Sequence, residues 1–206
     1  MSDPHVEQRI KQYITGAVLP NLNPAAPDDE KWGNELRKVC VMFVNLGIKE
    51  QQLLAAARYE EACEDVHQVL CVVQKSIYQY EGAINKFLMD DKGSTLVACF
   101  GLPPGAHEND ASRGVLAALN VCEQLFSMGL SASCGLTYGE VFCGIIGTRV
   151  RREYTVLGDC VNLSARLMQR AKAEGIGVLC DESVVAECGT ELLFTELNPI
   201  YVKGKR

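Results

Sequence analysis

The sequence lacks the short motifs that mark the commonest nucleotide, hydrolase and metal sites. It contains no Walker loop, no Gly-x-Gly-x-x-Gly, no Gly-x-Ser-x-Gly and no His-Glu-x-x-His. No Cys-x-x-Cys occurs among the ten cysteines, and the three histidines are scattered along the chain. These absences argue against the common NTPase and dinucleotide-binding scaffolds and against a zinc site.

Excess positive charge and long apolar runs are also missing. The net charge is -6, so the chain has no electrostatic footprint for nucleic acid. No apolar run reaches about 18 residues, which excludes a membrane-spanning helix, and the first residues do not resemble a signal peptide. The cysteines lie mostly inside apolar runs, so we expect buried free thiols in a reducing compartment.

Apolar residues are abundant, at 48% of 206 residues, which is enough for one large domain with its own core. Residues 4–19 have the apolar spacing of an amphipathic helix, and residues 20–38 hold prolines and charges typical of a linker. We therefore expect an N-terminal helix and linker over 1–38 and the main domain over 39–206.

Hairpins and long helices alternate along the main domain. The run Val39 to Leu46 is nearly all apolar and predicts a central strand covered on both faces. The remaining expected elements are a helix over 49–80, a hairpin of strands 83–89 and 95–100, a helix over 108–128, a second hairpin of strands 131–137 and 140–146 turning at Tyr138-Gly139, a short strand over 177–180, a short helix over 181–188 and an extended segment over 192–202. This order predicts an α+β fold, with one sheet and helices packed on it.

The stretch from Glu153 to Arg166 carries the clearest chemical signal. Its first half predicts a strand ending at Leu157, followed by a turn in which Asp159 caps a helix over 160–171. Asn162 and Arg166 are four residues apart on that helix, so they share a face near its positive end. An amide, a guanidinium and a helix start that point one way suit a phosphorylated ligand.

The pattern Arg151-x-x-Tyr-Thr-Val-x-Gly-Asp-x-Val-Asn-x-x-x-Arg166 resembles the signature of class III nucleotidyl cyclase catalytic domains. Segment 82–86, the glycines of 139–147 and Val202-Lys-Gly204 extend this resemblance over residues 39–204. It implies a ferredoxin-like βαββαβ core with an added hairpin and a C-terminal strand–helix–strand unit. Finer features resemble the second cyclase domain of soluble adenylyl cyclases: Phe43-Val-Asn-Leu46, Ile84-Asn-Lys86, Asp91-Lys-Gly93 and Val141-Phe-Cys-Gly-Ile145.

The resemblance implies two such domains facing each other with ATP between them, one of which supplies two aspartates for two metal ions. Asn45 stands at the position of the first aspartate, and a neutral amide lacks the charge that such a site needs. Asp90 would be the second, but the turn from Asp90 to Ser94 reads as longer than the family's. We therefore expect no metal ligand in this chain, and Mg²⁺ or Mn²⁺ held by a partner first domain.

The complementary set of residues is intact. By resemblance, Lys86 donates to an adenine ring nitrogen, Thr155 contacts the adenine amino edge, and the Val156 backbone adds a second contact. Asn162 orients the ribose, and Arg166 stabilises charge on the α-phosphate. Lys86 favours ATP, because a guanylyl cyclase is expected to carry an acidic residue there. The resemblance also suggests bicarbonate and calcium as activators and a cytoplasmic setting.

Each of these residues taken alone has a plainer explanation. Lys86 could be a solvated strand lysine, Asn162 an early-helix polar residue, and Arg166 a partner of a surface carboxylate. As one spaced set they favour the second catalytic half of an adenylyl cyclase. The alternatives are a degenerate cyclase domain used for dimerisation or nucleotide sensing and, more weakly, half of a guanylyl cyclase.

Overall fold

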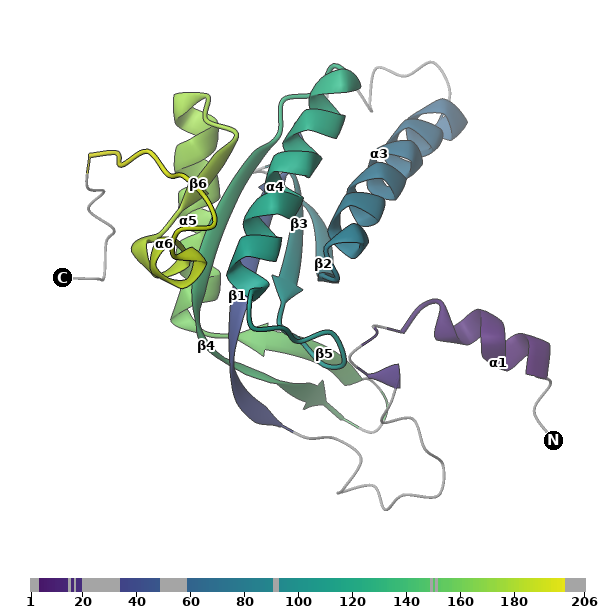
Figure 1. Ribbon diagram of the computed structural model, residues 1–206. Coiled ribbons are helices and arrows are strands. Elements are labelled where there is room, and N and C mark those ends of the chain that lie inside the picture. Colours follow the sequence, from purple (N-terminus) through teal and green to yellow (C-terminus); the bar gives the residue numbers. More distant parts are fainter. Residues whose placement is uncertain are drawn as a thin grey trace.

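The computed structural model describes residues 4–14, 16, 18–19, 34–48, 59–90, 93–148, 150 and 152–198. Its helices and strands are α1 (Pro4–Lys11), β1 (Glu35–Asn45), α3 (Tyr59–Gln79), β2 (Ala83–Asp90), β3 (Gly93–Phe100), α4 (Asp110–Ser127), β4 (Ser133–Gly147), β5 (Arg152–Leu157), α5 (Asp159–Glu174), β6 (Val178–Cys180) and α6 (Glu182–Cys188) (Figure 1). Among the described residues, no helix is long and apolar enough to cross a membrane.

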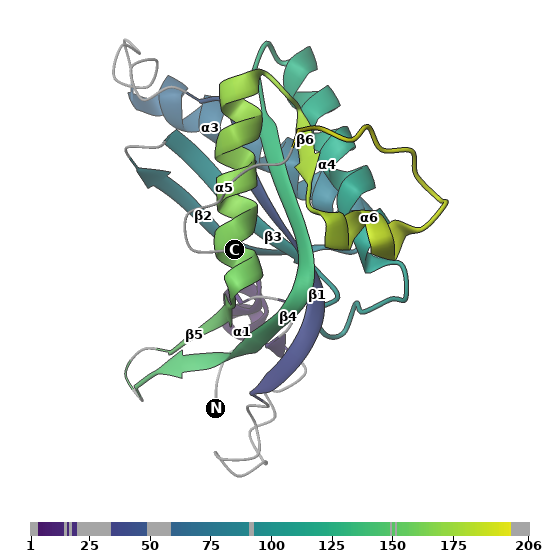
Figure 2. The same cartoon turned by 90° about the vertical axis from the view of Figure 1, so that its left-hand side faces the viewer.

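The strands form one mixed sheet, which confirms the α+β prediction. Its order is β2-β3-β1-β4-β5 with antiparallel neighbours, and β6 pairs in parallel with β4. Figure 2 shows α5 in front of this sheet and α3 and α4 behind it. The sheet is therefore covered by helices on both faces.

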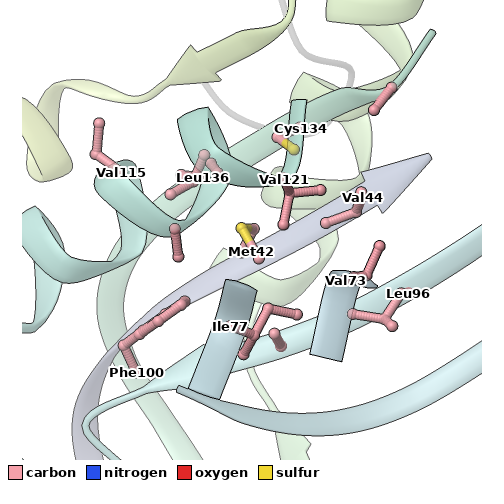
Figure 3. Close-up of a cluster of buried hydrophobic side chains, with 14 of the residues drawn as sticks. Met42, Val44, Val73, Ile77, Leu96, Phe100, Val115, Val121, Cys134 and Leu136 are labelled. Carbon is pink, nitrogen blue, oxygen red and sulfur yellow. The ribbon is translucent and has the colours of Figure 1, made fainter. Parts of the chain in front are cut away.

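The central strand β1 explains why both faces need cover. Met42 and Val44 point into the larger core, where they pack with α3, α4 and the strands on either side (Figure 3). Val39 and Val41 point to the opposite face, into a second core that contains residues of β5 and the start of α5. All four side chains are fully buried. Alternate residues serve the two cores, which is why the run is almost continuously apolar.

The second predicted hairpin is wrong. Residues 133–147 form one strand, β4, which pairs with β1 from Ser133 to Cys143 and with β5 from Phe142 to Gly147. Gly139 lies in mid-strand opposite Val39 and lacks the positive φ that a tight hairpin turn often requires. Long-range pairing with β1 has overridden a local turn signal.

Several predicted boundaries also differ. The N-terminal helix ends at Lys11 rather than at residue 19, and β1 starts at Glu35, inside the expected linker. Residues 192–198 form no strand. The parts of the predictions that fall on 49–58, Asp91, Arg151 and 199–204 lie outside the described residues.

The ten cysteines are free thiols, as expected from their apolar surroundings. Cys63 and Cys71 on α3 are exposed, and the other eight are buried or partly buried. Burial raises the pKa of Cys40 and Cys99 and raises that of Cys180 to about 12. These three thiols therefore remain protonated at neutral pH and behave as small apolar side chains.

Gly135 of β4 sets how closely α5 approaches the sheet. A Cβ at this position would overlap backbone atoms of Ser164 and Met168. Backbone atoms in a helix cannot swing aside as a side chain can, so α5 can lie in this place only because residue 135 has no side chain. This contact places the whole helix that carries Asn162 and Arg166.

We predict that Gly135→Ala destabilises the protein by about 3 kcal/mol, because the added methyl group forces α5 away from β4. Gly16→Ala is the control, since a Cβ at Gly16 meets nothing within 4 Å. Urea denaturation monitored by circular dichroism measures both. Equal stability of the two variants would contradict the close packing of α5 on β4.

Candidate active site

The helix α5 is fixed at its start as well as at Gly135. The Thr137 hydroxyl on β4 donates to the Cys160 carbonyl at 2.9 Å, and both residues are buried. Ser164 is fully buried one turn later and donates to the Val161 carbonyl at 2.8 Å. The first two turns of α5 are therefore held by hydrogen bonds and by packing against β4.

Asp159 is not the helix cap that the sequence predicted. The cap position is Gly158, so no side chain caps the helix, and Asp159 is already the first residue of α5. A Cβ at Gly158 would lie 3.0 Å from Val141 Cγ1 and 3.2 Å from the Glu140 carbonyl oxygen. Close packing of the β5–α5 turn on β4 therefore favours glycine at the cap. Asp159 can still stabilise α5 through the helix dipole.

Asn162 and Arg166 lie as predicted on one side of α5. Both are exposed, whereas Ser164 between them and Leu167 after them are buried. Their spacing of four residues stacks them one turn apart on the solvent side. The structure thus presents an amide and a guanidinium together, close to the helix start.

Lys86 owes its orientation to an irregularity in β2. Ile84 pairs with Ala98 but Lys86 pairs with Val97, so Asn85 is an extra residue, a β-bulge. In a regular register Lys86 would face the same way as Leu96, toward the larger core under α3 and α4. The bulge turns Lys86 to the Val97 face, which carries the second core and β5.

On that face Lys86 meets β5. Its Nζ lies 2.8 Å from Oε1 of Glu153, although β2 and β5 are at opposite ends of the strand order. Figure 1 shows β5 crossing the lower part of the molecule toward the start of α5. Both side chains are partly exposed, so this ion pair contributes about 0–1 kcal/mol and can be exchanged for a ligand at little cost.

Thr155 lies on the same side of β5 as Glu153, because side chains alternate along a strand. Tyr154 and Val156 point the other way, into the second core, where burial raises the pKa of the Tyr154 phenol. Thr155 is 7% exposed and Val156 is 5% exposed. The structure therefore brings Lys86 close to the segment of β5 that carries Thr155, and Thr155 is almost entirely buried.

The first ligand position of the expected metal corner carries an amide in this chain. Asn45 is 2% exposed, and its Oδ1 accepts a hydrogen bond from the Gly47 amide at 3.1 Å. A neutral amide oxygen that is already engaged is a poor substitute for a carboxylate. The described residues contain no cluster of three or more His, Cys, Asp or Glu side chains that could hold a metal ion.

The turn beside this corner is shorter than the sequence suggested. Asp90 pairs with Gly93, so only two residues separate the paired strands β2 and β3, and the extent predicted for the turn, from Asp90 to Ser94, is wrong. The strands simply extend further than their apolar pattern indicates. The side chain of Asp90 lies outside the described part of the chain.

Sequence reasoning missed four residues that shape this site. Gly135 and Thr137 place α5, Asn85 turns Lys86, and Glu153 pairs with it. Only Gly135 had a usable signal, since an isolated glycine in an apolar strand often marks a close backbone approach. Neither the bulge nor the ion pair has a signature in a single sequence.

Comparison with known proteins matches this chain to one family. The family model of the adenylate and guanylate cyclase catalytic domain matches residues 34–206 of the chain. The chain is 34% identical over 214 residues to adenylate cyclase type 10 of Rattus norvegicus, and 33% identical over 208 residues to that of Homo sapiens. Each alignment covers 98% of the chain but only 12% of the length of the relative.

Solved structures agree on the fold. A bacterial light-regulated adenylyl cyclase superposes with a TM-score of 0.75 at 19% identity, covering 91% of this chain and 55% of that one. The adenylyl cyclase CyaB from P. aeruginosa gives 0.69 at 20% identity, covering 84% and 91%. At such identities the likeness establishes the architecture alone.

We predict that Thr137→Val lowers the free energy of unfolding by about 1–2 kcal/mol, because the buried Cys160 carbonyl loses a hydrogen-bond donor. Thr190→Val makes the same chemical change at an exposed position and should stay within about 0.5 kcal/mol of wild type. Chemical denaturation compares the two. A Thr137→Val protein as stable as wild type would show that this hydroxyl does not hold α5.

Proposed function

The chain belongs to the adenylate and guanylate cyclase catalytic domain family, and from that premise we propose that it is the second catalytic half of a soluble-type adenylyl cyclase. It converts ATP to 3′,5′-cyclic AMP and pyrophosphate when it is paired with a metal-bearing first cyclase domain. The observation that carries this proposal is the convergence of Lys86 and the Thr155 side of β5 in a chain whose metal corner holds Asn45.

The base is read by Lys86 and β5. The Lys86 ammonium leaves Glu153 and donates to a ring nitrogen of adenine, while the edge of Thr155 and the backbone at Val156 meet the amino side of the base. Guanine carries a hydrogen on the equivalent ring nitrogen, so it offers Lys86 no acceptor there. This difference favours ATP over GTP.

The reacting phosphate is steadied by α5. The ribose 3′-oxygen attacks the α-phosphorus, the bond from that phosphorus to the bridging oxygen of pyrophosphate breaks, and the hydroxyl proton is lost. Asn162 orients the ribose for this attack. Arg166 offsets the negative charge that develops on the α-phosphate, a role for which a fixed guanidinium is well suited. Mg²⁺ or Mn²⁺ belongs to the partner domain, since Asn45 cannot replace the aspartate.

A second candidate function rests on Asn45 itself. A cyclase domain without metal ligands could serve as a dimerisation or nucleotide-sensing module with no turnover of its own. The exposed pair Asn162 and Arg166 and the reoriented Lys86 argue for the enzyme. Guanylyl cyclase remains a weaker alternative because of Lys86. Activation by bicarbonate and calcium and a cytoplasmic location are carried by the resemblance alone.

We predict that the purified chain alone makes almost no cyclic AMP from ATP and Mn²⁺, because Asn45 stands in place of the first metal carboxylate. Adding a metal-bearing first domain of a soluble-type adenylyl cyclase should produce cyclic AMP, with GTP a much poorer substrate. Product is measured by chromatography. Strong turnover by the chain alone would contradict the proposal that the metal ions are held by a partner domain. A pair that makes no cyclic AMP would favour the dimerisation or nucleotide-sensing module.

We predict that Arg166→Ala lowers kcat of this pair about a hundredfold or more, because an oriented donor to the transition-state charge is lost. Arg170→Ala is the matched control. It removes the same side chain one turn further along α5, where Arg170 pairs with Glu174. Its kcat should be unchanged. Equal rates for the two variants would remove Arg166 from the proposed chemistry.

A further inference from the structure

A positive charge of the chain itself lies at the corner where β1 ends and β2 turns into β3. The corner is bordered by Asn45 from β1, Gly93 from β3 and Lys172 from the last turn of α5. A Cβ placed on Gly93 would lie 3.3 Å from Asn45 Nδ2 and 3.7 Å from Lys172 Nζ. The amide nitrogen and the ammonium therefore border the same small space.

The Asn45 amide and the Lys172 ammonium determine which kind of ion can bind in this space. The Asn45 oxygen is turned to the Gly47 amide at 3.1 Å, so the NH₂ end of the side chain faces Gly93. The ammonium of Lys172 adds a full positive charge beside it. An amide donor and an ammonium, which is itself a donor and a cation, disfavour a divalent ion, because such an ion needs oxygen ligands and negative charge.

The position of Lys172 follows from the way α5 is held. Gly135 lets the helix lie directly on β4, and Ala171, beside Lys172, is fully buried. This fixes the backbone at residue 172, so the lysine extends from a rigid point toward Gly93. A lysine stem can lie along a protein surface while its ammonium reaches a polar site.

We propose that the Lys172 ammonium takes the place that a divalent ion occupies in a metal-bearing cyclase half. The chain closes its own metal corner with a built-in monovalent cation, so two changes, Asn45 and Lys172, keep metal out. This inference rests on the proposed pairing of unequal halves. It assigns to Lys172 the role of excluding metal from the corner of this half, whereas the partner half binds metal at the equivalent corner.

Metal binding by the purified chain tests this directly, without ATP or a partner domain. The proteins are wild type, Asn45→Asp, Lys172→Met and the double variant Asn45→Asp/Lys172→Met. The matched control is Asn45→Asp/Lys75→Met, which has the same net charge but loses an exposed lysine of α3. Asn45→Asp/Lys172→Gln is a second version that keeps a polar side chain, in case methionine impairs folding.

The readouts are the melting temperature with and without Mn²⁺ and the loss of the free Mn²⁺ signal in electron paramagnetic resonance. We expect Mn²⁺ to raise the melting temperature of the two double variants that lack Lys172 by about 4 °C or more, and that of the other proteins by less than about 1 °C. Folding is checked by circular dichroism.

Three results would overturn the proposal. They are Mn²⁺ binding by wild type, equal binding by Asn45→Asp with Lys172 in place, and no binding by either version of the double variant. Because no turnover is measured, the outcome is separate from that of the proposed function. A pair that makes cyclic AMP is compatible with any of these results, and an inactive pair leaves the metal measurement valid.

Discussion

The contact of α5 with Gly135 is the constraint on which the site depends. Helix backbone lies directly against strand backbone there, at a distance that no side chain at residue 135 permits. Because α5 carries Asn162 and Arg166 near its start and Lys172 near its end, this one contact places both the polar groups of the proposed site and the charge beside Asn45. The Thr137 hydrogen bond then fixes the helix start.

A second constraint acts at the far edge of the sheet. The bulge at Asn85 turns Lys86 away from the main core and toward β5, where Glu153 holds its ammonium. If Asn85 paired with Val97 in a regular register, Lys86 would lie opposite Leu96 and be directed under α3 and α4, where burying an unpaired charge is costly. The irregular strand is thus what makes a lysine possible at this position and what makes it available to a ligand.

The sequence predicted the architecture well where each segment carries its own periodic signal. The run Val39 to Leu46 indicated a strand with two buried faces, and Asn162 and Arg166 were placed together by helical spacing alone. The predictions failed where pairing between distant segments decides the outcome. Gly139 resembles a turn residue, but pairing with β1 along its length keeps β4 as one strand.

The same distinction applies within the site. Lys86 and Thr155 are 69 residues apart, and only the path of β5 across the sheet brings their strands together. The ion pair with Glu153, the bulge and the approach of Lys172 to Asn45 are tertiary effects that no local pattern encodes. Family resemblance suggested the roles of Lys86 and Thr155, and the geometry shows how their strands come close together.

The central claim is that this chain brings the nucleotide-reading and charge-stabilising side chains while its partner brings the metals. A crystal structure of the pair with a non-hydrolysable ATP analogue and Mn²⁺, whose ions are located by anomalous scattering, tests it most directly. The account predicts Lys86 at the base, Arg166 at the α-phosphate and both Mn²⁺ ions on carboxylates of the partner. An Mn²⁺ ion bound beside Asn45, or a base far from Lys86, would contradict it.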